Sequence, residues 1–294
     1  MNLKIPEYWE KDNLIEIVSR YLFEGKLILI LGAGVSSSLS LPDWEELVSR
    51  LYIANSEMED TSFQISKRVE ILREKHFKNN EENFKIAVQK ELYKNCDLSF
   101  KKLSNLSLLP ALGATIMSSR RGNASNVITF NFDNLLELYL GFHGFTINSC
   151  QTEKHWNTNS DVQIYHPHGC VPALPFQFFN SEKLIFSLND FIKRISNPDH
   201  PWNIKLKALM SSHFCLFIGL RGEDIALTSL LQAVEKIHIL DDSDSLFWGI
   251  CFLRRRGEYE KSNWEQYRVL INEIEEHSEI HDFLFKVCQK AASY

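Results

Sequence analysis

The sequence predicts an α/β fold in which an open parallel sheet is flanked by helices. Short apolar runs rich in branched residues recur along the chain, as is typical of strands that are covered on both faces. Each run ends in glycine or polar residues and is followed by a helical pattern of apolar residues, which favours a parallel sheet with helices between its strands. These segments lie within residues 27–31, 126–137, 164–171 and 214–231.

The first strand is expected at 27–31, after an amphipathic helix over 12–23. Gly32 and Gly34 follow the strand, and the lack of a Cβ atom at these positions would let the backbone approach a ligand closely. Backbone N–H groups at such a turn also favour an anion. Because a strand that ends in two glycines can equally be a tight turn, this segment alone leaves nucleotide binding and a purely structural turn open.

The segment after the glycine turn is predicted to be helical. A helix is expected over 44–53, and residues 55–119 are highly charged, with apolar residues three and four apart and no strand signal. We interpret 55–119 as an inserted helical subdomain. Near the end of the chain, the pattern predicts a strand at 246–253 and a C-terminal helix at 259–291.

Polar residues stand where each predicted strand ends. The segment Thr129–Asp133 (TFNFD) follows the second strand, His166 and His168 lie one proline apart after the third, and Gly219 follows the fourth. Because the carboxyl ends of parallel strands lie at one edge of a sheet, where ligands bind, we expect these segments to meet at one site.

Together these motifs resemble those of the sirtuin (SIR2-like) superfamily. That pattern is a Gly-Ala-Gly turn with a nearby serine and Pro-Asp, a Thr-x-Asn-x-Asp segment, a His-Gly pair and a late strand that ends in a glycine turn. The chain carries the motifs in the same order over about residues 14–231, as Gly32-Ala33-Gly34 with Ser36 and Pro42-Asp43, Thr129-Phe130-Asn131-Phe132-Asp133, His168-Gly169 and Gly219-Leu220-Arg221. The resemblance implies one SIR2-like domain over 1–294 with a Rossmann-like core, in which the helical subdomain at 55–119 sits over the nucleotide cleft.

Two departures from the superfamily pattern indicate which members of the superfamily the chain resembles most. Protein-deacylating sirtuins carry a four-cysteine zinc module after the His-Gly pair and an arginine soon after the Pro-Asp pair. The six cysteines of this chain are scattered singly without a Cys-x-x-Cys pair, so their spacing excludes a structural zinc ribbon, and Asp43 is followed by Trp44 and two glutamates. We therefore expect no zinc module and no metal site. The pattern resembles bacterial SIR2-like effectors, which hydrolyse NAD+ in defence against phage.

The resemblance also implies roles for individual residues, with NAD+ as the substrate. Asn131 would hydrogen-bond the nicotinamide ribose or the attacking water, and His168 would act as general base near neutral pH. Asp133 would contact the nicotinamide amide or a ribose hydroxyl, and Asp43 would help to close the loop around the dinucleotide. The other residues expected to bind NAD+ are Gly32, Ala33, Gly34 and Ser36 at the phosphates, Gly219 beside the adenosine half, and Thr129.

Several of these residues have a structural alternative. Asn131 could cap the following helix, since asparagine is common at strand-to-helix junctions, but the His-Gly pair favours catalysis. His166 could serve as the base, but only His168 precedes glycine, so we expect a structural role for His166. Asp224 is expected to cap the helix that follows it rather than to contact the dinucleotide, and Trp44 is expected to fill the core.

Composition restricts the class of protein. With 294 residues and 20 phenylalanines, the chain is long enough to bury a large core. It has no apolar run long enough to span a membrane and no signal-peptide pattern, and singly scattered cysteines are typical of a reducing compartment. A net charge of −6 argues against nucleic acid as the main ligand. We expect a cytoplasmic protein.

These inferences predict an NAD+ glycohydrolase that depletes NAD+ as an effector of abortive infection. The alternatives are a non-catalytic module that binds NAD+ or ADP-ribose and signals to a partner, and a protein deacylase. Because a freely active NAD+ hydrolase would poison its own cell, we expect its activity to be gated. The resemblance to such effectors implies a separately encoded sensor: an Argonaute-like protein, a HerA-like ATPase or a nucleotide-processing protein whose product activates the effector. The segment 55–119 and the C-terminal helix are the expected contact surfaces in an oligomeric assembly, without direct contact with nucleic acid or membrane.

Overall fold

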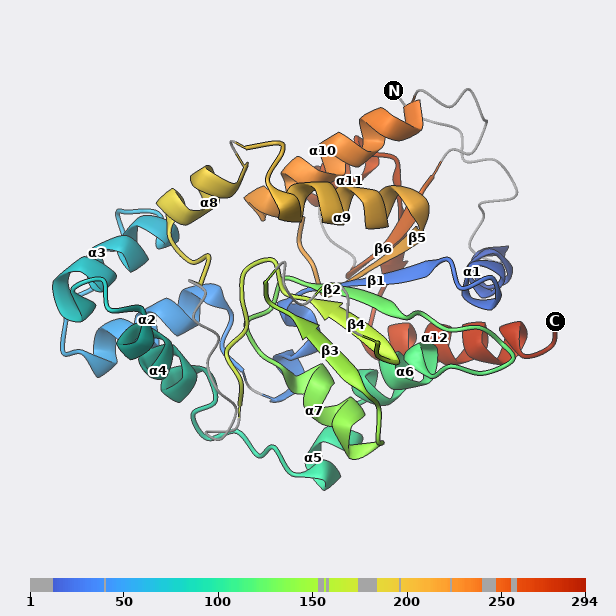
Figure 1. Ribbon diagram of the computed structural model, residues 1–294, viewed down its shortest axis with the longest axis horizontal. Helices are drawn as coiled ribbons and strands as arrows, with labels where there is room; N and C mark the ends of the chain where they lie inside the picture. Colours follow the sequence, from blue (N-terminus) through green and yellow to red (C-terminus); the bar gives the residue numbers. More distant parts are fainter. Residues whose placement is uncertain are drawn as a thin grey trace.

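The computed structural model describes residues 13–39, 41–152, 156, 159–173, 184–195, 197–222, 224–239, 247–254 and 258–294. Within these residues, seven parallel strands form one open sheet in the order β3-β4-β2-β1-β5-β6-β7 (Figure 1). The strands are β1 (Leu27–Leu31), β2 (Asn126–Thr129), β3 (Ile147–Cys150), β4 (Val162–Tyr165), β5 (Phe214–Ile218), β6 (Gly249–Arg254) and β7 (Val269–Ile274). The predicted open parallel α/β sheet of Rossmann-like type is confirmed.

The central strand is β1, whose five residues are all buried. It pairs with β2 on one side and β5 on the other, so that Ile30 lies beside both Ile128 and Phe217. Alternate side chains of a strand point to opposite faces, and accordingly Leu29 belongs to one core and Ile30 to the other. Because helices cover both faces of the sheet, this strand is continuously apolar rather than alternating.

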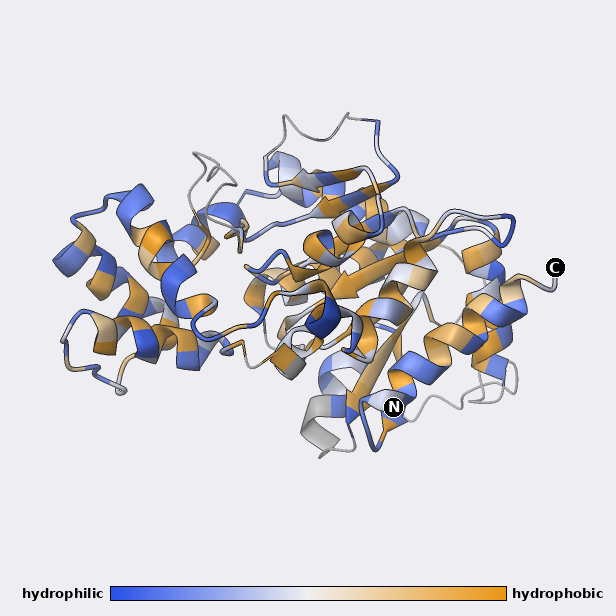
Figure 2. Cartoon of the chain, turned by 90° about the horizontal axis from the view of Figure 1, so that it is seen from below, coloured by the Kyte–Doolittle hydropathy of each residue, from blue (hydrophilic) through white to orange (hydrophobic). Residues whose placement is uncertain are grey.

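Helices cover both faces of the sheet. One core joins the sheet to α1 (Leu14–Phe23), α5 (Phe100–Ser104), α6 (Leu108–Ile116), α7 (Leu135–Phe142) and α12 (Ser278–Ala291), and the other joins it to α8 (Leu188–Ile195), α9 (Pro201–Ser212), α10 (Ile225–Ile239) and α11 (Glu258–Glu265). Figure 2 shows hydrophobic strands surrounded by helices that carry both hydrophobic and hydrophilic residues. None of the described helices combines the length and the hydrophobicity needed to span a bilayer.

A third core lies beside the sheet, at the left of Figure 1, and is formed by α2 (Trp44–Ala54), α3 (Ile65–Phe77) and α4 (Glu81–Leu92). The segment 55–119, expected as one helical subdomain, therefore contributes to two cores. Its helices α3 and α4 pack with α2 around Phe84, whereas α5 and α6 pack against the sheet through Leu103 and Leu112. Periodicity shows which side of a helix is apolar, but it does not show which core that side joins.

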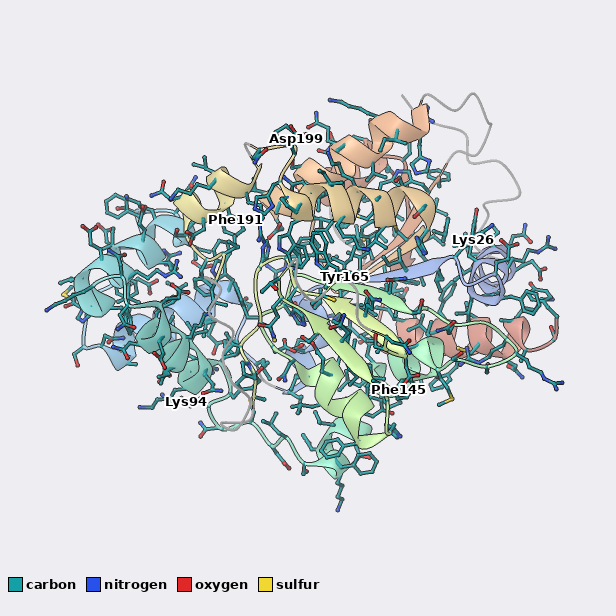
Figure 3. The ribbon with its side chains drawn as sticks, in the orientation of Figure 1. Lys26, Lys94, Phe145, Tyr165, Phe191 and Asp199 are labelled. Carbon is teal, nitrogen blue, oxygen red and sulfur yellow. The ribbon has the colours of Figure 1, made fainter. Side chains whose placement is uncertain are left out.

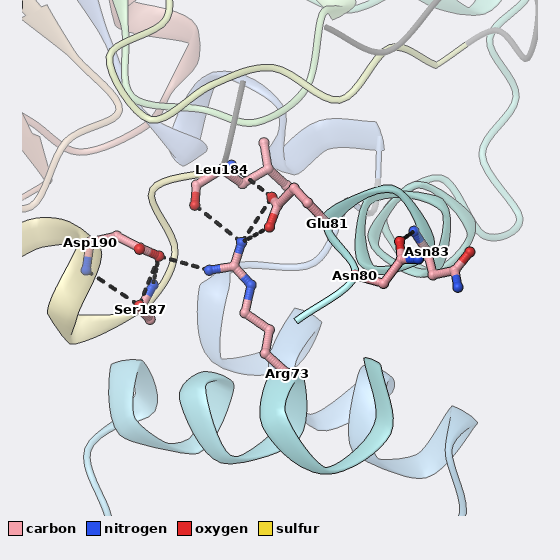
Figure 4. Close-up of polar contacts among 7 residues, drawn as sticks. All are labelled: Arg73, Asn80, Glu81, Asn83, Leu184, Ser187 and Asp190. Carbon is pink, nitrogen blue, oxygen red and sulfur yellow. Dashed lines mark hydrogen bonds and ion pairs between the residues drawn. The ribbon is translucent and has the colours of Figure 1, made fainter. Parts of the chain in front are cut away.

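A buried network around Arg73 joins α3 to the start of α8 (Figure 4). Arg73 Nη1 lies 2.7 Å from Asp190 Oδ2, and Nη2 lies 2.8 and 2.7 Å from the two carboxylate oxygens of Glu81. Asp190 also accepts a hydrogen bond of 2.7 Å from the Ser187 hydroxyl. The guanidinium group is thus matched by two carboxylates, and it anchors the helical turn that carries Phe191, a residue of the candidate site.

Two strands were not predicted from the sequence. The helix expected over 259–291 is divided into α11, β7 and α12, and β7 pairs with β6 at one edge of the sheet. β3 forms the opposite edge and carries the polar sequence INSC, which has little strand signal. A strand as short and polar as β3 is hard to recognise from periodicity alone. Residue 12 of the first expected helix and residue 246 of the expected strand lie outside the described residues.

Candidate functional site

The carboxyl ends of β1, β2, β4 and β5 meet at one edge of the sheet, as expected for parallel strands. A cavity of about 570 Å³ lies there beside the turns after β1 and β5, and a cavity of about 120 Å³ adjoins it. Among the predicted site residues, the larger cavity is lined by Gly32, Ala33, Gly34, Asp43, Asn131 and Gly219, and the smaller by Ala33, Ser36, Asp43, Asn131, Asp133 and His168. Thr129 lines neither cavity.

The turn after β1 packs directly on the turn after β5. Gly32 N–H donates to Ile218 O and Gly34 N–H donates to Gly219 O, both at 3.0 Å. A Cβ atom on Gly34 would lie 2.7 Å from Gly219 Cα, and Gly219 has a φ of +72°. The missing Cβ atoms were expected to let a ligand approach the backbone. In the structure, the neighbouring backbone turn occupies this space.

The N–H groups of the first turn are mostly used within the protein. Val35 N–H donates to Gly32 O at 3.0 Å and Ser36 N–H donates to Ala33 O at 3.1 Å, in the short helix η3 (Ala33–Val35). For Ala33 N–H, the described residues provide no acceptor. The expectation that the amides of Gly32, Ala33 and Gly34 all face a ligand therefore needs correction. Close packing of the two turns satisfies the glycine amides and leaves Ala33 N–H available.

Asn131 is held by a network of hydrogen bonds behind the cavities. Its side-chain Nδ2 donates to Gly32 O at 3.1 Å and to Ser36 Oγ at 3.3 Å, and its backbone N–H donates to Thr129 Oγ1 at 3.2 Å. Both of these side-chain hydrogen bonds are made by Nδ2, and within the described part of the chain none is made by Oδ1. Asn131 therefore has a hydrogen-bond acceptor available to a ligand in either cavity.

Asp133 provides the helix contact that was considered for Asn131. Its Oδ1 accepts the N–H of Leu135, the first residue of α7, at 3.2 Å, and its Oδ2 accepts from the Ser36 hydroxyl at 2.8 Å. Burial raises the pKa of Asp133 above its usual value, and these hydrogen bonds only partly offset that effect. Ser36, expected at the phosphates, instead links Asn131 to Asp133.

His168 forms a pair with Asp224, the residue before α10. His168 Nε2 lies 2.9 Å from Asp224 Oδ2, while Asp224 Oδ1 accepts the N–H of Leu227 at 2.8 Å. The predicted cap at Asp224 is confirmed, but its second role beside His168 was missed. Burial by itself raises the pKa of Asp224, but His168 and the backbone N–H groups outweigh it and hold that pKa below 3.8.

The other ring nitrogen of His168 is buried, and Nδ1 has no hydrogen-bond partner among the described residues. Asp224 accepts the Nε2 proton in the tautomer that this pairing favours, so Nδ1 carries the lone pair. The signal that could have identified Asp224 is its position just after the glycine turn of β5, at the same sheet edge as His168.

Aromatic rings surround His168. Phe130 lies 5.2 Å and Phe191 5.1 Å from the imidazole between ring centroids, and Phe191 is also 6.0 Å from Trp44. Phe191 belongs to α8 and is labelled in Figure 3. Trp44, which was expected to fill the core, packs half-buried against two of the cores and also lines both cavities. These rings restrict the access of water to His168.

Asp43 lines both cavities and is the N-cap of α2. Its Oδ1 accepts the N–H of Glu46 at 3.0 Å, and the residue is exposed. Three basic residues that were not predicted as site residues also line the larger cavity: Arg221, Arg254 and His277. Arg254 follows the same rule as the predicted residues, since it ends β6 at the same edge of the sheet.

A second cluster of titratable side chains lies behind Asn131. The possible ligand atoms of Glu137, His166 and Cys170 all lie within 4.8 Å of one another, close enough to share a metal ion. The sequence analysis found no such set, because Glu137 is far from the two other residues along the chain. The short contact of 2.5 Å between His166 Nε2 and Glu137 Oε1 also fits a buried ion pair.

Comparisons with known proteins identify the family. The family model described as SIR2-like domain matches residues 125–271, which include Asn131, His168 and Asp224. No curated protein matches the chain. A solved structure described as the structural basis for the mechanism and regulation of Sir2 enzymes is 12% identical, with a TM-score of 0.47, over 95% of this chain and 97% of that chain. Since the family model matches half of its residues, the chain belongs to the SIR2-like domain family.

Proposed function

We propose that the chain is an NAD+ glycohydrolase, which cleaves NAD+ to nicotinamide and ADP-ribose. SIR2-like superfamily members are NAD-dependent enzymes, so family membership supports a function that involves NAD+. The observation that carries the proposal of hydrolysis is the buried Nδ1 of His168, which has no hydrogen-bond partner within the described ranges of the chain. A buried nitrogen without a partner costs free energy, and a proton donor such as water or a ribose hydroxyl satisfies it.

In this proposal, His168 is the general base. Asp224 holds the Nε2 proton, so that Nδ1 accepts a proton from the attacking water. The water oxygen forms a bond to C1′ of the nicotinamide ribose, and the glycosidic C–N bond breaks. Its electron pair goes to the nicotinamide nitrogen, which neutralises the pyridinium charge. His168 and Asp224 therefore activate the attacking water, while the substrate supplies the leaving group.

Asn131 complements His168 in this reaction. Its side-chain nitrogen donates to two protein oxygens, and its Oδ1 has no partner among the described residues. Oδ1 is therefore the atom that orients a water or a ribose hydroxyl. Asp133 stands beside Ser36 at the rear of the same cavity, where its raised pKa suits hydrogen bonding to the carboxamide of nicotinamide. The aromatic rings around His168 exclude competing water.

The larger cavity suits the adenosine diphosphate half of NAD+. Its volume of about 570 Å³ lies within the usual range for ligand sites, whereas the adjoining cavity of about 120 Å³ is smaller than that range of roughly 300–1,000 Å³. Ala33 N–H and the basic residues Arg254 and His277 line the larger space. The smaller space must widen to admit the nicotinamide ribose.

Because the smaller cavity must widen before NAD+ can bind, its size supports the proposal that activity is gated. We place the chain as an effector of a bacterial anti-phage system, which depletes NAD+ when a separate Argonaute-like, HerA-like or nucleotide-processing partner, or a nucleotide signal, activates it. The helices of 55–119 and α12 are the proposed contact surfaces in an oligomeric complex. Trp44 of α2 and Phe191 of α8 line the small cavity, so a partner that binds the helical core can change its width.

The deciding experiment measures NAD+ loss and nicotinamide formation by the purified chain, with and without lysate from phage-infected cells. His168→Ala is the matched control. Loss of NAD+ only with the wild-type chain supports the glycohydrolase, and dependence on infected lysate supports gating. Binding of NAD+ without its consumption under every condition refutes hydrolysis and favours a binding module. Consumption that requires an acylated peptide favours the deacylase.

A further inference from the structure

A buried pair of ionisable side chains lies directly behind Asn131 and outside both cavities. His166, just after β4, is 0% exposed. Its Nε2 lies 2.5 Å from Glu137 Oε1 on α7, and its Nδ1 lies 3.4 Å from the backbone carbonyl oxygen of Asn131. Glu137 Oε1 also accepts from the Ser149 hydroxyl at 3.1 Å. The reaction proposed above uses none of these groups directly, apart from Asn131.

Both ring nitrogens of His166 face oxygen acceptors. A neutral imidazole has one N–H and can satisfy only one of them, whereas the imidazolium donates to both. Burial by itself lowers the pKa of His166, but the Glu137 carboxylate, the Asn131 carbonyl oxygen and Asp133 together outweigh burial and raise that pKa above its usual value. The neighbouring Cys170 thiol stays protonated, because burial raises its pKa well above 9.

The contact with the Asn131 carbonyl completes the restraint of that residue. Thr129 Oγ1 accepts the backbone N–H of Asn131, and Gly32 and Ser36 accept from its side chain. Among the described residues, His166 is the one partner of the Asn131 carbonyl oxygen, so without it this part of the backbone would be less restrained. A shift of the Asn131 backbone would move its Cα atom, and the side chain attached there would carry Oδ1 away from the position at which it orients water.

We infer that the His166–Glu137 ion pair is a positioning device, which holds the backbone of Asn131 so that its side chain meets the substrate. This role rests on the proposed glycohydrolase function. Neither member of the pair contacts substrate, and Glu137 acts only through His166. The pair therefore supports the rate of the chemical step and contributes little to the affinity for NAD+, which depends on the glycine turns and the larger cavity.

The same atoms suggest a competing role as a metal site, since Glu137, His166 and Cys170 converge within 4.8 Å. The two roles exclude each other, because a metal ion at His166 Nε2 displaces the proton that bonds to Glu137. Metal analysis of the purified chain tests this role. One zinc or other metal ion per chain, together with a loss of folding stability when a chelator removes it, would overturn the ion pair. Absence of metal from a chain that is fully folded supports it.

The activity test uses Glu137→Gln, which keeps the size of the side chain and removes its charge. We expect kcat for NAD+ to fall by about 10- to 100-fold, the usual effect of losing an orienting partner, with KM nearly unchanged. The control is Glu91→Gln, since Glu91 is 2% exposed and pairs with Lys94 rather than with a site residue. Wild-type kcat in Glu137→Gln, or an equal loss in Glu91→Gln, overturns the positioning role.

A second measurement does not depend on activity. The sequence contains two Asn-Phe pairs, Asn83–Phe84 and Asn131–Phe132, so labelling asparagine carbonyl carbons with ¹³C and phenylalanine amides with ¹⁵N yields two selective NMR correlations. We expect the Asn131 carbonyl to shift when His166 loses its proton at alkaline pH, and in Glu137→Gln, while the Asn83 carbonyl stays unchanged. An unmoved Asn131 carbonyl overturns the inference even where Glu137→Gln fails to fold. A shift in a chain that consumes no NAD+ refutes the glycohydrolase and leaves the restraint of Asn131 supported.

Discussion

Replacement of Asp224 by asparagine tests the His168 pair with little change in shape. Asparagine keeps an oxygen for the Leu227 N–H, and asparagine and aspartate are similarly good N-caps. Its Nδ2 atom, however, is a donor and lies where Asp224 Oδ2 accepts from His168 Nε2 at 2.9 Å. The ring proton of His168 must then move to Nδ1. The nitrogen proposed to act as base would already carry a proton.

The expected loss of activity is large and the expected loss of stability is small. In serine proteases, the equivalent change of aspartate to asparagine lowers kcat by about 10⁴ through the same shift of tautomer. We expect turnover of NAD+ to fall by about 10³ to 10⁴, which corresponds to roughly 4–5.5 kcal/mol of transition-state stabilisation. The lost charge-assisted hydrogen bond costs about 1–3 kcal/mol of folding free energy, while the cap remains.

The assay is NAD+ loss by the activated chain, combined with urea unfolding of the chain alone. Asp161→Asn is the matched control, since Asp161 Oδ2 also accepts a backbone N–H, from Thr146 at 2.7 Å, and lines neither cavity. The pKa of Asp224 is held below 3.8, so its charge stabilises the fold above that pH, and this stabilisation is lost as the pH falls through the folded-state pKa. The stabilities of wild type and Asp224→Asn should therefore converge in acid.

Wild-type turnover in Asp224→Asn would refute the reasoning, because it would show that the tautomer of His168 does not depend on Asp224. Asp224 would then be a helix cap only. An equal loss of turnover in Asp161→Asn would also count against it, since that variant leaves the ring unchanged.

Three further predictions concern other parts of the site. Asn131→Ala should abolish NAD+ loss with little change in Tm, and a large fall in Tm by calorimetry would instead support a structural role. Gly34→Ala places a Cβ atom 2.7 Å from Gly219 Cα, so we expect a destabilisation of about 1–3 kcal/mol and weaker binding of NAD+; unchanged urea unfolding would contradict the close packing of the turns. Arg73→Met removes the cationic partner of the buried Asp190 carboxylate and should cost about 3–5 kcal/mol in urea unfolding; a loss below about 1 kcal/mol would show that the network does not anchor α8.

Most of the candidate site could be predicted from strand ends. Asn131, Asp133, His168 and Gly219 each follow an apolar run, and parallel pairing necessarily brings such positions to one edge. The role of each residue at this edge of the sheet could not be predicted in the same way. Ser36 was expected to bind phosphate, but its hydroxyl donates to Asp133.

The partners of the two histidines illustrate why. Asp224 is 56 residues from His168, and Glu137 is 29 residues from His166. No local pattern links such positions, because their proximity depends on the sheet order and on where α7 and α10 begin. The buried state that gives each pair its effect on pKa also arises only when the helices pack on the sheet.

The sequence by itself determined the class of fold, the central strand and the edge at which the site lies, because periodicity and glycine turns are local properties of the chain. Only the tertiary structure decided which groups meet there: the glycine turn against Gly219, Asp224 on His168, and Glu137 on His166 behind Asn131. It also divided the helices of 55–119 between two cores. Hydrogen-bond partners and burial depend on contacts between distant segments, and packing of the whole chain is what brings those segments together.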